Sequence, residues 1–254
     1  MSTRSAPPAQ APTEVGRPVH LSVTVLIPTL NEERNIGWVL THLPPQVDEV
    51  LVVDGGSTDR TIEVVRMIRP DARIIVEPRR GKGTAIRTGI AAATGDIVAM
   101  LDADCSMDPT ELAAFIEPVA EGFDLVKGSR FLPGGGTTDM TTLRRLGNWG
   151  LVQLANRMYG VNFSELCYGY MAFRRKAILD LGLVSSGFEI ETEIVVRSIR
   201  SGYEITEVPS FEAERRFGVS NLHTFRDGWR VLRTMLRERG WNSVPMAEDE
   251  AVTS

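Results

Sequence analysis

The sequence has only two cysteines in 254 residues, Cys105 and Cys167, and neither has the companion ligands that a zinc site needs. So few cysteines exclude a disulfide scaffold and indicate a reducing compartment. The formal net charge is −5, which excludes the overall basic excess of many nucleic-acid-binding proteins. No apolar run approaches the roughly 18 residues that cross a bilayer. Any specific function therefore has to come from local motifs.

Both ends of the chain are expected to be loose. Residues 1–19 are rich in Pro, Ala and Ser without a hydrophobic segment, which predicts a disordered tail rather than a signal peptide. Residues 242–254 predict a second loose tail. Hydrophobic residues make up 43% of the sequence, enough for a substantial core between them. We expect a cytoplasmic protein with no internal repeat.

Strand and helix patterns alternate through the first half of the chain. Apolar, β-branched segments predict strands at 21–29, 48–54, 72–77, 96–101 and 123–131. Helices are predicted at 31–43, 57–69, 83–95 and 108–122. Their expected caps are Asn31 for the first helix, Ser57 or Thr58 for the second and Gly95 at the end of the third, with Pro109 opening the fourth. This alternation predicts an α/β fold with a parallel sheet whose two faces are covered.

The alternation stops after residue 132. A helix is predicted at 143–160, a short strand and helix at 168–182, a helix at 189–202 and an edge strand at 203–213. We therefore divide the folded part into two halves of one domain, residues 20–131 and residues 132–241.

Asp102 and Asp104 follow the fourth predicted strand, in the segment "VAMLDADCSMDP". Side chains at i and i+2 of an extended segment point the same way, so these carboxylates should repel each other unless a cation lies between them. Hard oxygen ligands suit Mg²⁺ or Mn²⁺, with phosphate oxygens completing the shell. A solvated strand end is the alternative.

Polar residues also follow the other predicted strands. They are Thr29 and Asn31, Asp54, Glu77 and Arg79, and Ser129 and Arg130. Ligands of parallel sheets bind at the carboxyl ends of the strands, so these side chains mark a site. Asp54 precedes two glycines and predicts either a nucleoside contact or only a tight turn.

The segment "EPRRGKGTAIRTG" places Arg79, Arg80 and Lys82 beside glycines at a helix start, where phosphate binds well. A solvated basic turn is the alternative. The sequence has no dinucleotide-binding G-x-G-x-x-G after its first strand, and this basic segment lacks the Walker A spacing. These absences argue against a dinucleotide dehydrogenase and against a Walker A phosphate loop.

Together these motifs resemble those of the family 2 glycosyltransferases, which have the Rossmann-like GT-A fold. The segments that carry the resemblance, in chain order, are "VLIPTLNEERNI", "VVDGGSTDRT", "GKGTAIRTGI", "LDADCSMDP", "LVKGSRF", "CYGYMAFRR", "GFEIETEI" and "RRFGVSNL". The likeness is greatest to the branch that transfers a hexose to dolichyl or polyprenyl phosphate. It implies a mostly parallel sheet flanked by helices, a nucleotide-sugar-binding half at 20–131 and an acceptor-binding half at 132–241.

The resemblance also implies site residues. The nucleotide-sugar, of the GDP-mannose or UDP-glucose type, is expected at Pro28, Thr29, Asn31, Glu32, Asp54, Arg79, Lys82, Gly83, Asp102 and Ala103. Mg²⁺ or Mn²⁺ is expected at Asp102 and Asp104. The acceptor phosphate is expected at Arg130, Arg145, Arg215 and Ser220, with Arg144 as the alternative to Arg145.

Two departures from the family pattern leave the acceptor open. Asn221 replaces a lysine, and Glu191 replaces a glutamine. A hydroxyl acceptor would need a general base, for which Glu191 and Glu193 are candidates. Two other classes remain, a nucleotidyltransferase and a non-catalytic sugar-nucleotide-binding protein.

The helix predicted at 222–239 has two stripes. The apolar one consists of Phe225, Trp229, Leu232 and Leu236, and the basic one of Arg226, Arg230, Arg233 and Arg237. Such a helix can lie peripherally on the inner face of an anionic membrane. We favour the alternative, in which the apolar stripe packs on the core and the arginines are solvated.

Overall fold

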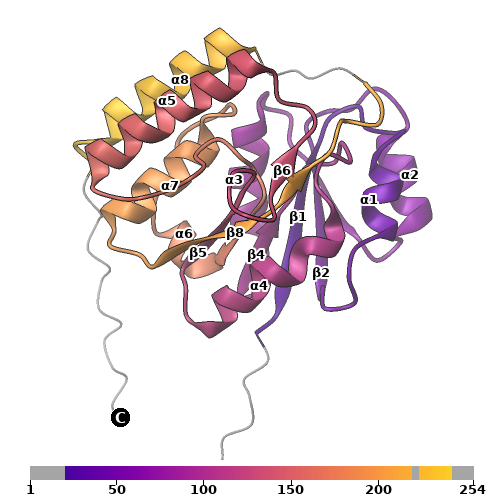
Figure 1. Ribbon diagram of the computed structural model, residues 1–254. Coiled ribbons are helices and arrows are strands. Elements are labelled where there is room, and N and C mark those ends of the chain that lie inside the picture. The colour runs from indigo at the N-terminus through magenta and orange to yellow at the C-terminus, as the bar shows by residue number, and fades with distance from the viewer. Residues whose placement is uncertain (1–20, 219–222, 242–254) are drawn as a thin grey trace, which may run out of the picture.

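The computed structural model describes residues 21–218 and 223–241, and Figure 1 shows its arrangement. Seven strands form one sheet in the order β3-β2-β1-β4-β7-β5-β8. Their bounds are β1 Val23–Thr29, β2 Glu49–Asp54, β3 Arg73–Val76, β4 Ile97–Met100, β5 Leu125–Ser129, β7 Met171–Arg174 and β8 Ile205–Pro209. Two short strands, β6 (Gly136–Thr137) and β9 (Phe211–Glu212), pair separately. The two predicted tails lie outside the described residues.

The sheet is parallel except for β7, which pairs antiparallel with both β4 and β5. The predicted α/β fold with a mostly parallel sheet is confirmed, and β8 lies at an edge as expected. The sequence did not predict that β7 would separate the fourth and fifth strands. Because β7 runs in the opposite direction, it begins where its neighbours end. This brings the segment before it, residues 165–170, to the carboxyl edge of β4 and β5.

Helices cover both faces of the sheet. One face carries α1 (Ile36–Thr41), α2 (Thr61–Ile68) and α4 (Leu112–Glu121), which follows a 3-10 turn at Pro109–Glu111. The other carries α3 (Lys82–Ala92), α6 (Arg175–Leu179) and α7 (Ile190–Arg200), with α5 (Thr142–Tyr159) and α8 (Thr224–Glu238) outside α7. Apolar residues therefore point to both sides of the strands.

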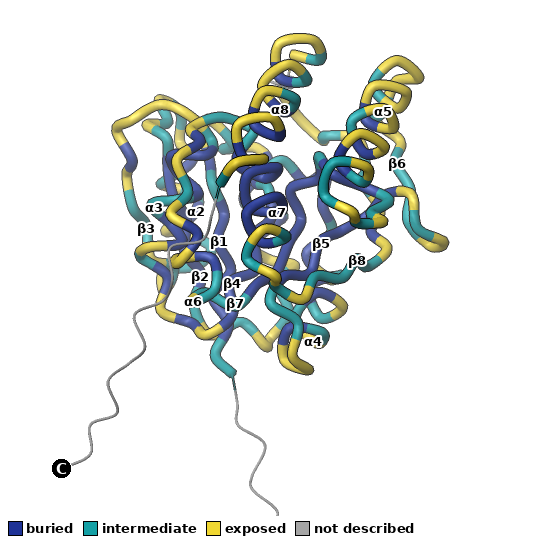
Figure 2. Tube along the Cα trace, turned by 90° about the vertical axis from the view of Figure 1, so that its left-hand side faces the viewer, coloured by how far each residue is buried: buried dark blue, intermediate teal, exposed yellow. Residues whose placement is uncertain are grey.

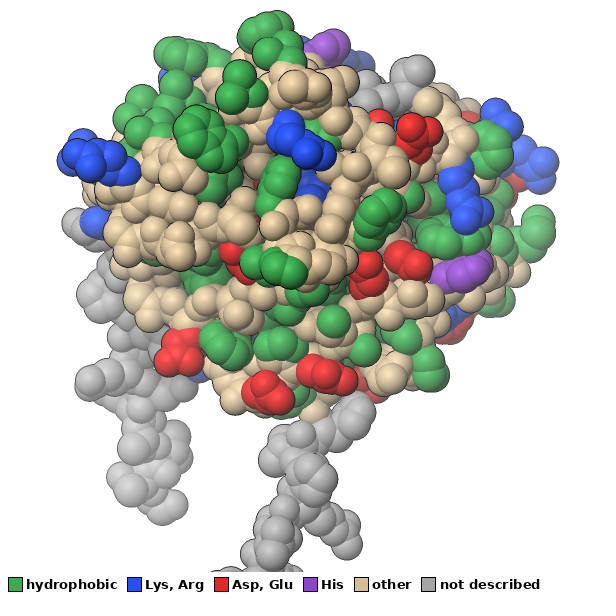
Figure 3. Space-filling model, in the orientation of Figure 1, with side chains coloured by type: hydrophobic (Ala, Val, Ile, Leu, Met, Phe, Trp, Pro, Cys, Tyr) green, Lys and Arg blue, Asp and Glu red, His purple; other side chains and the backbone are tan. Residues whose placement is uncertain are grey.

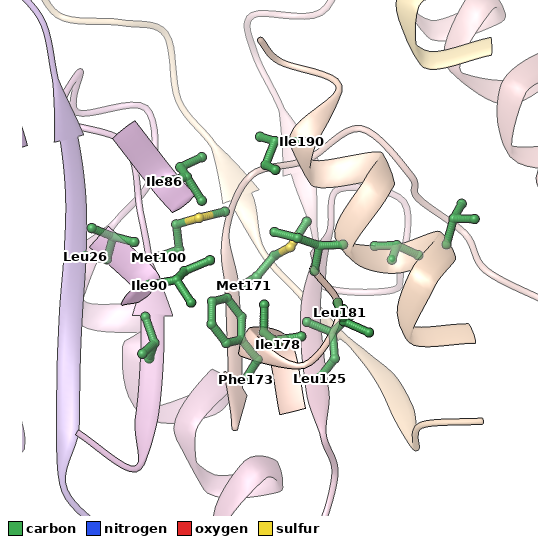
Figure 4. Packing of buried hydrophobic residues seen from close by; sticks show 14 of the residues in the cluster. Leu26, Ile86, Ile90, Met100, Leu125, Met171, Phe173, Ile178, Leu181 and Ile190 are labelled. Atoms are coloured by element: carbon green, nitrogen blue, oxygen red, sulfur yellow. The ribbon is translucent and has the colours of Figure 1, made fainter. Parts of the chain in front are cut away.

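Successive side chains of each strand point to opposite faces of the sheet, and this divides the core into two clusters. Leu26 packs with α3 and α7 on one face, whereas its neighbours Val25 and Ile27 pack with α1 and α4 on the other. Figure 4 shows the first cluster, in which Met171 lies near Ile190. Because both faces are dry, the strands carry few polar residues until their ends.

Two predicted helix starts are wrong. The first helix begins after Asn35, and Asn31 instead adopts a φ of 57° and accepts the backbone N–H of Thr58 at 2.8 Å. The second begins after Arg60 rather than at Ser57 or Thr58. The polar side chains of both segments are used to join the two loops, because both loops lie at the same edge of the sheet.

The predicted end of the third helix is also wrong. It ends at Ala92, with Ala93 as its cap, and Gly95 lies beyond it. The Gly95 N–H donates to Thr24 Oγ1 at 2.9 Å, and a Cβ there would lie 2.7 Å from the Thr24 nitrogen. The predicted helix of 143–160 does end at a left-handed glycine, Gly160.

The apolar stripe of α8 faces outward, contrary to our expectation. Phe225 is 80% exposed and Trp229 64% exposed, while Val231 and Met235 face α7. In Figure 2, α5 and α8 stand as two exposed ridges outside α7. The buried face of α8 also carries polar residues, so the periodicity of its apolar residues alone did not identify the packing face. None of the described helices has the length and apolar character needed to cross a bilayer.

Candidate active site

A cleft of about 310 Å³ opens at the carboxyl edge of the sheet. Segments from both halves of the chain line it. Its charged lining residues are Lys82, Asp102, Asp104, Arg130, Asp139, Arg144, Glu191, Glu212, Glu214 and Arg215. Six carboxylates against four basic side chains leave a formal charge of −2. A cleft with this balance is suited to accept a divalent cation.

Lys82 links the first carboxylate of the D-x-D segment to α7. Its Nζ lies 2.7 Å from Asp102 Oδ1 and 2.8 Å from Glu191 Oε1. Burial opposes the charge of Lys82, but the two carboxylates outweigh it and raise the lysine pKa above its usual value. Burial, together with the charges of Asp104 and Glu191, raises the pKa of Asp102 to about 6, although Lys82 counteracts this shift.

Arg215 pairs in the same way with the second carboxylate. Its Nη2 lies 2.8 Å from Asp104 Oδ2, and its Nη1 lies 2.8 Å from Glu32 Oε1. The other oxygen of Asp104 accepts the N–H of Ser106 at 3.0 Å and its hydroxyl at 2.7 Å. Cys105 between them has a φ of 65°, so the chain turns sharply here at some energetic cost.

The expected repulsion between Asp102 and Asp104 is therefore relieved by side chains of the protein itself. Each carboxylate has its own basic partner, Lys82 or Arg215. Among the described residues, no group of three or more His, Cys, Asp and Glu is placed to hold a metal ion. Two carboxylates still fit a hard divalent cation that takes most of its oxygen ligands from bound phosphates and water.

Arg130, just after β5, also lines the cleft and is 6% exposed. Its Nε donates to Glu165 Oε2 at 2.8 Å, and its Nη1 donates to Glu212 Oε2 at 2.9 Å. Burial acts against the charge, but these two carboxylates raise the pKa of Arg130 above its usual value. A guanidinium held this firmly is a fixed part of the wall.

The other predicted acceptor arginines differ in position. Arg144 lines the cleft, and its Nη1 lies 3.4 Å from the carbonyl oxygen and 3.5 Å from the carboxylate of the half-exposed Asp139. Arg145 lies outside the cleft, on the exposed side of α5, where it borders a separate apolar pocket. Of the two alternatives, the structure brings Arg144 into the site and not Arg145. Ser220, like Asn221, lies outside the described residues.

Asp54 is only 1% exposed and is occupied by its own turn. Its Oδ2 accepts the N–H groups of Gly56 and Ser57 at 3.0 and 2.9 Å, and its Oδ1 accepts the Ser57 hydroxyl. Thr29 Oγ1 lies 3.4 Å away on the neighbouring strand. The turn interpretation of Asp54 is thus confirmed, and its nucleoside contact stays a prediction.

Other predicted donor residues lie around this turn and the cleft. Pro28 is in β1, Ala103 is buried between the two aspartates, and Arg79 is exposed and paired with Glu77 at 2.8 Å. The Gly83 N–H donates to the Ser186 carbonyl at 3.0 Å. A Cβ on Gly83 would lie 2.7 Å from the carbonyl oxygen of Ser185. Close packing of the first turn of α3 against residues 185–187 explains this glycine, and its nucleotide-sugar contact stays a prediction.

The two candidate bases on α7 lie in different surroundings. Glu191 lines the cleft, whereas Glu193 is fully buried away from it. The Glu193 carboxylate accepts the N–H of Ser185 at 2.7 Å and pairs with Arg197 at 2.9 Å. Glu193 is therefore a structural acceptor, and its interpretation as a catalytic base is wrong.

Sequence reasoning missed three residues of this site. Glu165 and Glu212 fix Arg130 from positions 35 and 82 residues away. Gly169 lies against Glu191, because a Cβ at this glycine would be 2.6 Å from Glu191 Oε1. No local pattern marks these residues, since each depends on a contact between distant segments.

The cleft combines a carboxylate pair at a strand end with three arginines, at the edge of a mostly parallel α/β sheet. Carboxylates that can hold a divalent cation and arginines that can bind phosphate are chemically suited to phosphorylated ligands. The family model for glycosyl transferase family 2 matches residues 24–182, and the chain belongs to this family. It is a glycosyltransferase, which sets aside the nucleotidyltransferase and the non-catalytic alternatives.

Two curated relatives are archaeal. Glycosyltransferase AglJ of Haloferax volcanii is 35% identical over 228 residues, which cover 87% of this chain and 73% of the relative. A dolichyl-phosphate hexose transferase of the same organism is 31% identical over 218 residues, covering 85% of this chain and 92% of the relative. Both matches extend beyond residue 182 of the family model into the second half of the chain.

Solved structures show the same GT-A fold. Glucosyl-3-phosphoglycerate synthase from Mycobacterium tuberculosis, in complex with Mn²⁺, UDP-glucose and phosphoglyceric acid, superposes with a TM-score of 0.69 at 26% identity. The match covers 87% of this chain and 80% of that structure. A complex of the same enzyme with Mg²⁺ and UDP gives a TM-score of 0.69 at 25% identity.

Replacing Glu193 tests its structural assignment. We expect Glu193→Ala to lower the free energy of unfolding by about 3–5 kcal/mol, because it leaves the buried guanidinium of Arg197 without one of its carboxylate partners. The exposed helical Glu117→Ala should change stability by no more than about 0.5 kcal/mol. Denaturant unfolding of both variants provides the measurement. A Glu193 variant of wild-type stability would contradict the assignment.

Proposed function

We propose that this glycosyltransferase transfers a hexose from a nucleotide-sugar to the phosphate of a polyprenyl or dolichyl monophosphate, with inversion at the anomeric carbon. The observation that carries the proposal is the cleft itself. Asp102 and Asp104 line one part of it, and Arg130 and Arg144 line the part toward the second half of the chain. The similarity to a dolichyl-phosphate hexose transferase over most of both chains supports this acceptor.

On the donor side, Asp102 and Asp104 would hold a divalent cation, Mg²⁺ or Mn²⁺. Such an ion supplies positive charge to the departing nucleoside diphosphate. The structurally similar synthase binds Mn²⁺ with UDP-glucose, which supports the metal and a donor of this type. Lys82 and Arg215 occupy the two carboxylates in this structure. Both must loosen these contacts for the aspartates to bind an ion, and their charges then become available to the donor phosphates.

On the acceptor side, a phosphate oxygen is already an anion and needs positioning more than a base. Arg130 is locked by Glu165 and Glu212, so it presents a fixed positive edge. Among the described residues Arg144 makes longer contacts, at 3.4 Å to the Asp139 carbonyl and 3.5 Å to the Asp139 carboxylate, so it can turn toward a ligand. We therefore assign phosphate recognition mainly to Arg144, with Arg130 and Arg215 around it.

A hydroxyl acceptor is the second candidate, and the position of Glu191 favours it. This carboxylate lines the cleft beside Asp102, where a general base would act. The structurally similar synthase carries phosphoglyceric acid, a small hydroxyl-bearing molecule, together with its donor. The two candidates differ in whether Glu191 has to accept a proton.

Contact with a membrane surface follows from a lipid acceptor. Hydrophobic side chains gather over α5 and α8 in Figure 3, and the exposed ones include Trp149 and Trp229. Arg226 and Arg230 flank them on α8, with side chains 61% and 44% exposed. Aromatic residues beside arginines suit the interface of an anionic bilayer, so we assign this face as the peripheral contact.

Replacement of a metal-binding carboxylate tests the donor side. Asp104→Asn should reduce transfer by at least about a hundredfold, because the metal and the diphosphate lose a charged ligand. EDTA should abolish wild-type transfer, and added Mn²⁺ or Mg²⁺ should restore it. Asp71→Asn, at an exposed carboxylate outside the cleft, is the control. Full turnover of Asp104→Asn in buffer that contains EDTA would contradict the metal assignment.

The acceptor is tested with labelled donor and either a short polyprenyl phosphate or the corresponding alcohol. We expect product from the phosphate alone. Arg144→Met should raise the KM for that acceptor about tenfold or more, because the acceptor loses one charge-assisted contact. Arg157→Met, on the same helix, should leave this KM unchanged. Glu191→Gln should keep activity. If only hydroxyl acceptors give product, and Glu191→Gln abolishes that product, the hydroxyl acceptor is established instead.

Vesicle binding tests the surface assignment. The wild-type protein should sediment with vesicles of anionic phospholipid and less with neutral ones, and salt should weaken the binding. Trp229→Ser should reduce the bound fraction severalfold, because it removes an exposed aromatic residue from the contact. Met67→Ser, at a residue 71% exposed on α2, is the matched control. Equal binding of all three proteins would overturn the assignment.

A further inference from the structure

A groove between α5 and α8 continues from the cleft. We call it the inter-helix groove. It is lined by Gly147, Asn148 and Leu151 of α5, by Thr192 of α7, and by Gly228 and Val231 of α8. Arg144, Phe188 and Glu191 line both the groove and the cleft. A molecule bound at the cleft can therefore extend into the groove without crossing open solvent.

A hydrogen bond joins the carboxyl-terminal parts of the two helices. The Tyr159 hydroxyl of α5 donates to the Met235 carbonyl of α8 at 2.5 Å. Toward their amino-terminal halves the groove lies between them, with Thr192 of α7 as part of its lining. Figure 2 shows α5 and α8 as separate ridges on this side of the molecule.

Two glycines keep the groove open. Gly147 on α5 and Gly228 on α8 both line it, and a Cβ at either would meet no atom within 4 Å. A glycine inside a helix destabilises the helix relative to alanine. At Gly83 a close backbone contact explains the missing side chain, but no such contact exists at these two positions. Space beside the helices is what the two glycines provide.

Buried polar side chains without partners face the same groove. Asn148 is 8% exposed, and neither its Nδ2 nor its Oδ1 has a hydrogen-bond partner among the described residues. Thr192 is 1% exposed, and its Oγ1 likewise has no partner within the described part of the chain. A buried polar group left unsatisfied destabilises the folded protein. Such groups are typical of a site whose ligand supplies the missing hydrogen bonds.

The chemistry of the groove identifies an amphiphilic ligand. Asn148 offers a donor and an acceptor, and Thr192 offers a hydroxyl, so a head group with oxygen atoms would satisfy both. Leu151, Val231 and Phe188 supply apolar walls. The exposed rims of α5 and α8 carry large apolar residues, among them Trp149 and Trp229.

We infer that the inter-helix groove binds the part of an amphiphilic acceptor next to its reacting oxygen. Asn148 and Thr192 hydrogen-bond to phosphate oxygens that do not react, and the first apolar carbons pass between α5 and α8 toward the exposed rims. This inference rests on the proposed lipid acceptor and adds the residues that select it. Asn148 and Thr192 act as positioning and specificity residues, because they hold the phosphate with its reacting oxygen turned toward the arginines of the cleft.

Three variants test the groove, with farnesyl phosphate as the probe. Asn148→Leu should raise the acceptor KM about three- to tenfold, the loss of one or two hydrogen bonds. It should not lower the Tm, because the folded protein loses an unsatisfied group. Gly147→Leu should block the groove and raise the KM at least tenfold. Gly150→Leu is the matched control, since Gly150 lies on the same helix, also faces open space and does not line the groove.

Nucleotide-sugar affinity is measured for every variant by calorimetry and should stay at the wild-type value. Wild-type acceptor KM in both Asn148→Leu and Gly147→Leu would overturn the inference while leaving the lipid acceptor intact. If the wild-type protein makes no product from farnesyl phosphate, the proposed function fails instead. The groove is then judged by the Tm shift with farnesyl phosphate and with farnesol. If neither compound shifts the Tm of the wild type, or if the Tm shift is equally large in Gly147→Leu, the inference about the groove is overturned as well.

Discussion

The pairing of buried carboxylates with basic side chains from distant segments holds this site together. Lys82 pairs with Asp102 and also with Glu191, which lies 109 residues after Lys82 in the sequence. Arg215 pairs with Asp104, which lies 111 residues before it. Carboxylates this close to one another and this poorly solvated are stable in the charged form only with such partners. The same contacts fasten α7 and the segment before residue 218 to the edge of the sheet. Folding of the second half of the chain therefore completes the site of the first half.

These pairs also explain how the cleft can be stable without substrate and still receive the two anionic molecules of the function we propose. Asp102 and Asp104 are neutralised in the free protein by side chains that phosphate would also attract. In the function we propose, a metal ion and its nucleotide would compete with these internal contacts, so binding would exchange partners rather than expose bare charges. Arg130 takes no part in this exchange, because Glu165 and Glu212 hold it rigidly. The site thus combines a wall of fixed charge with two basic groups that can be released.

The sequence was most informative where chemistry and secondary structure coincide. The strands end at the predicted places, and the polar residues that follow β1, β2 and β4 meet at one edge because parallel strands require it. The ion pairs between distant side chains were not predictable. Arg130, Glu165 and Glu212, for example, come together only through the antiparallel insertion of β7. Glu191 and Glu193 belong to the same short motif, and only burial separates a cleft residue from a structural one. The apolar stripe of α8 showed amphipathic character without showing which side the core would take.

The exchange of partners at Asp104 is the central claim, and Mn²⁺ binding tests it most directly. Electron paramagnetic resonance measures the free ion during titration of nucleotide-free protein. Arg215→Met removes the competing guanidinium and should tighten Mn²⁺ binding by about tenfold, which corresponds to about 1.4 kcal/mol. Arg216→Met removes a neighbouring charge that lies over Trp38 instead and should have little effect. Equal or weaker Mn²⁺ binding by Arg215→Met would contradict the account, because Arg215 would then not compete with the ion for Asp104.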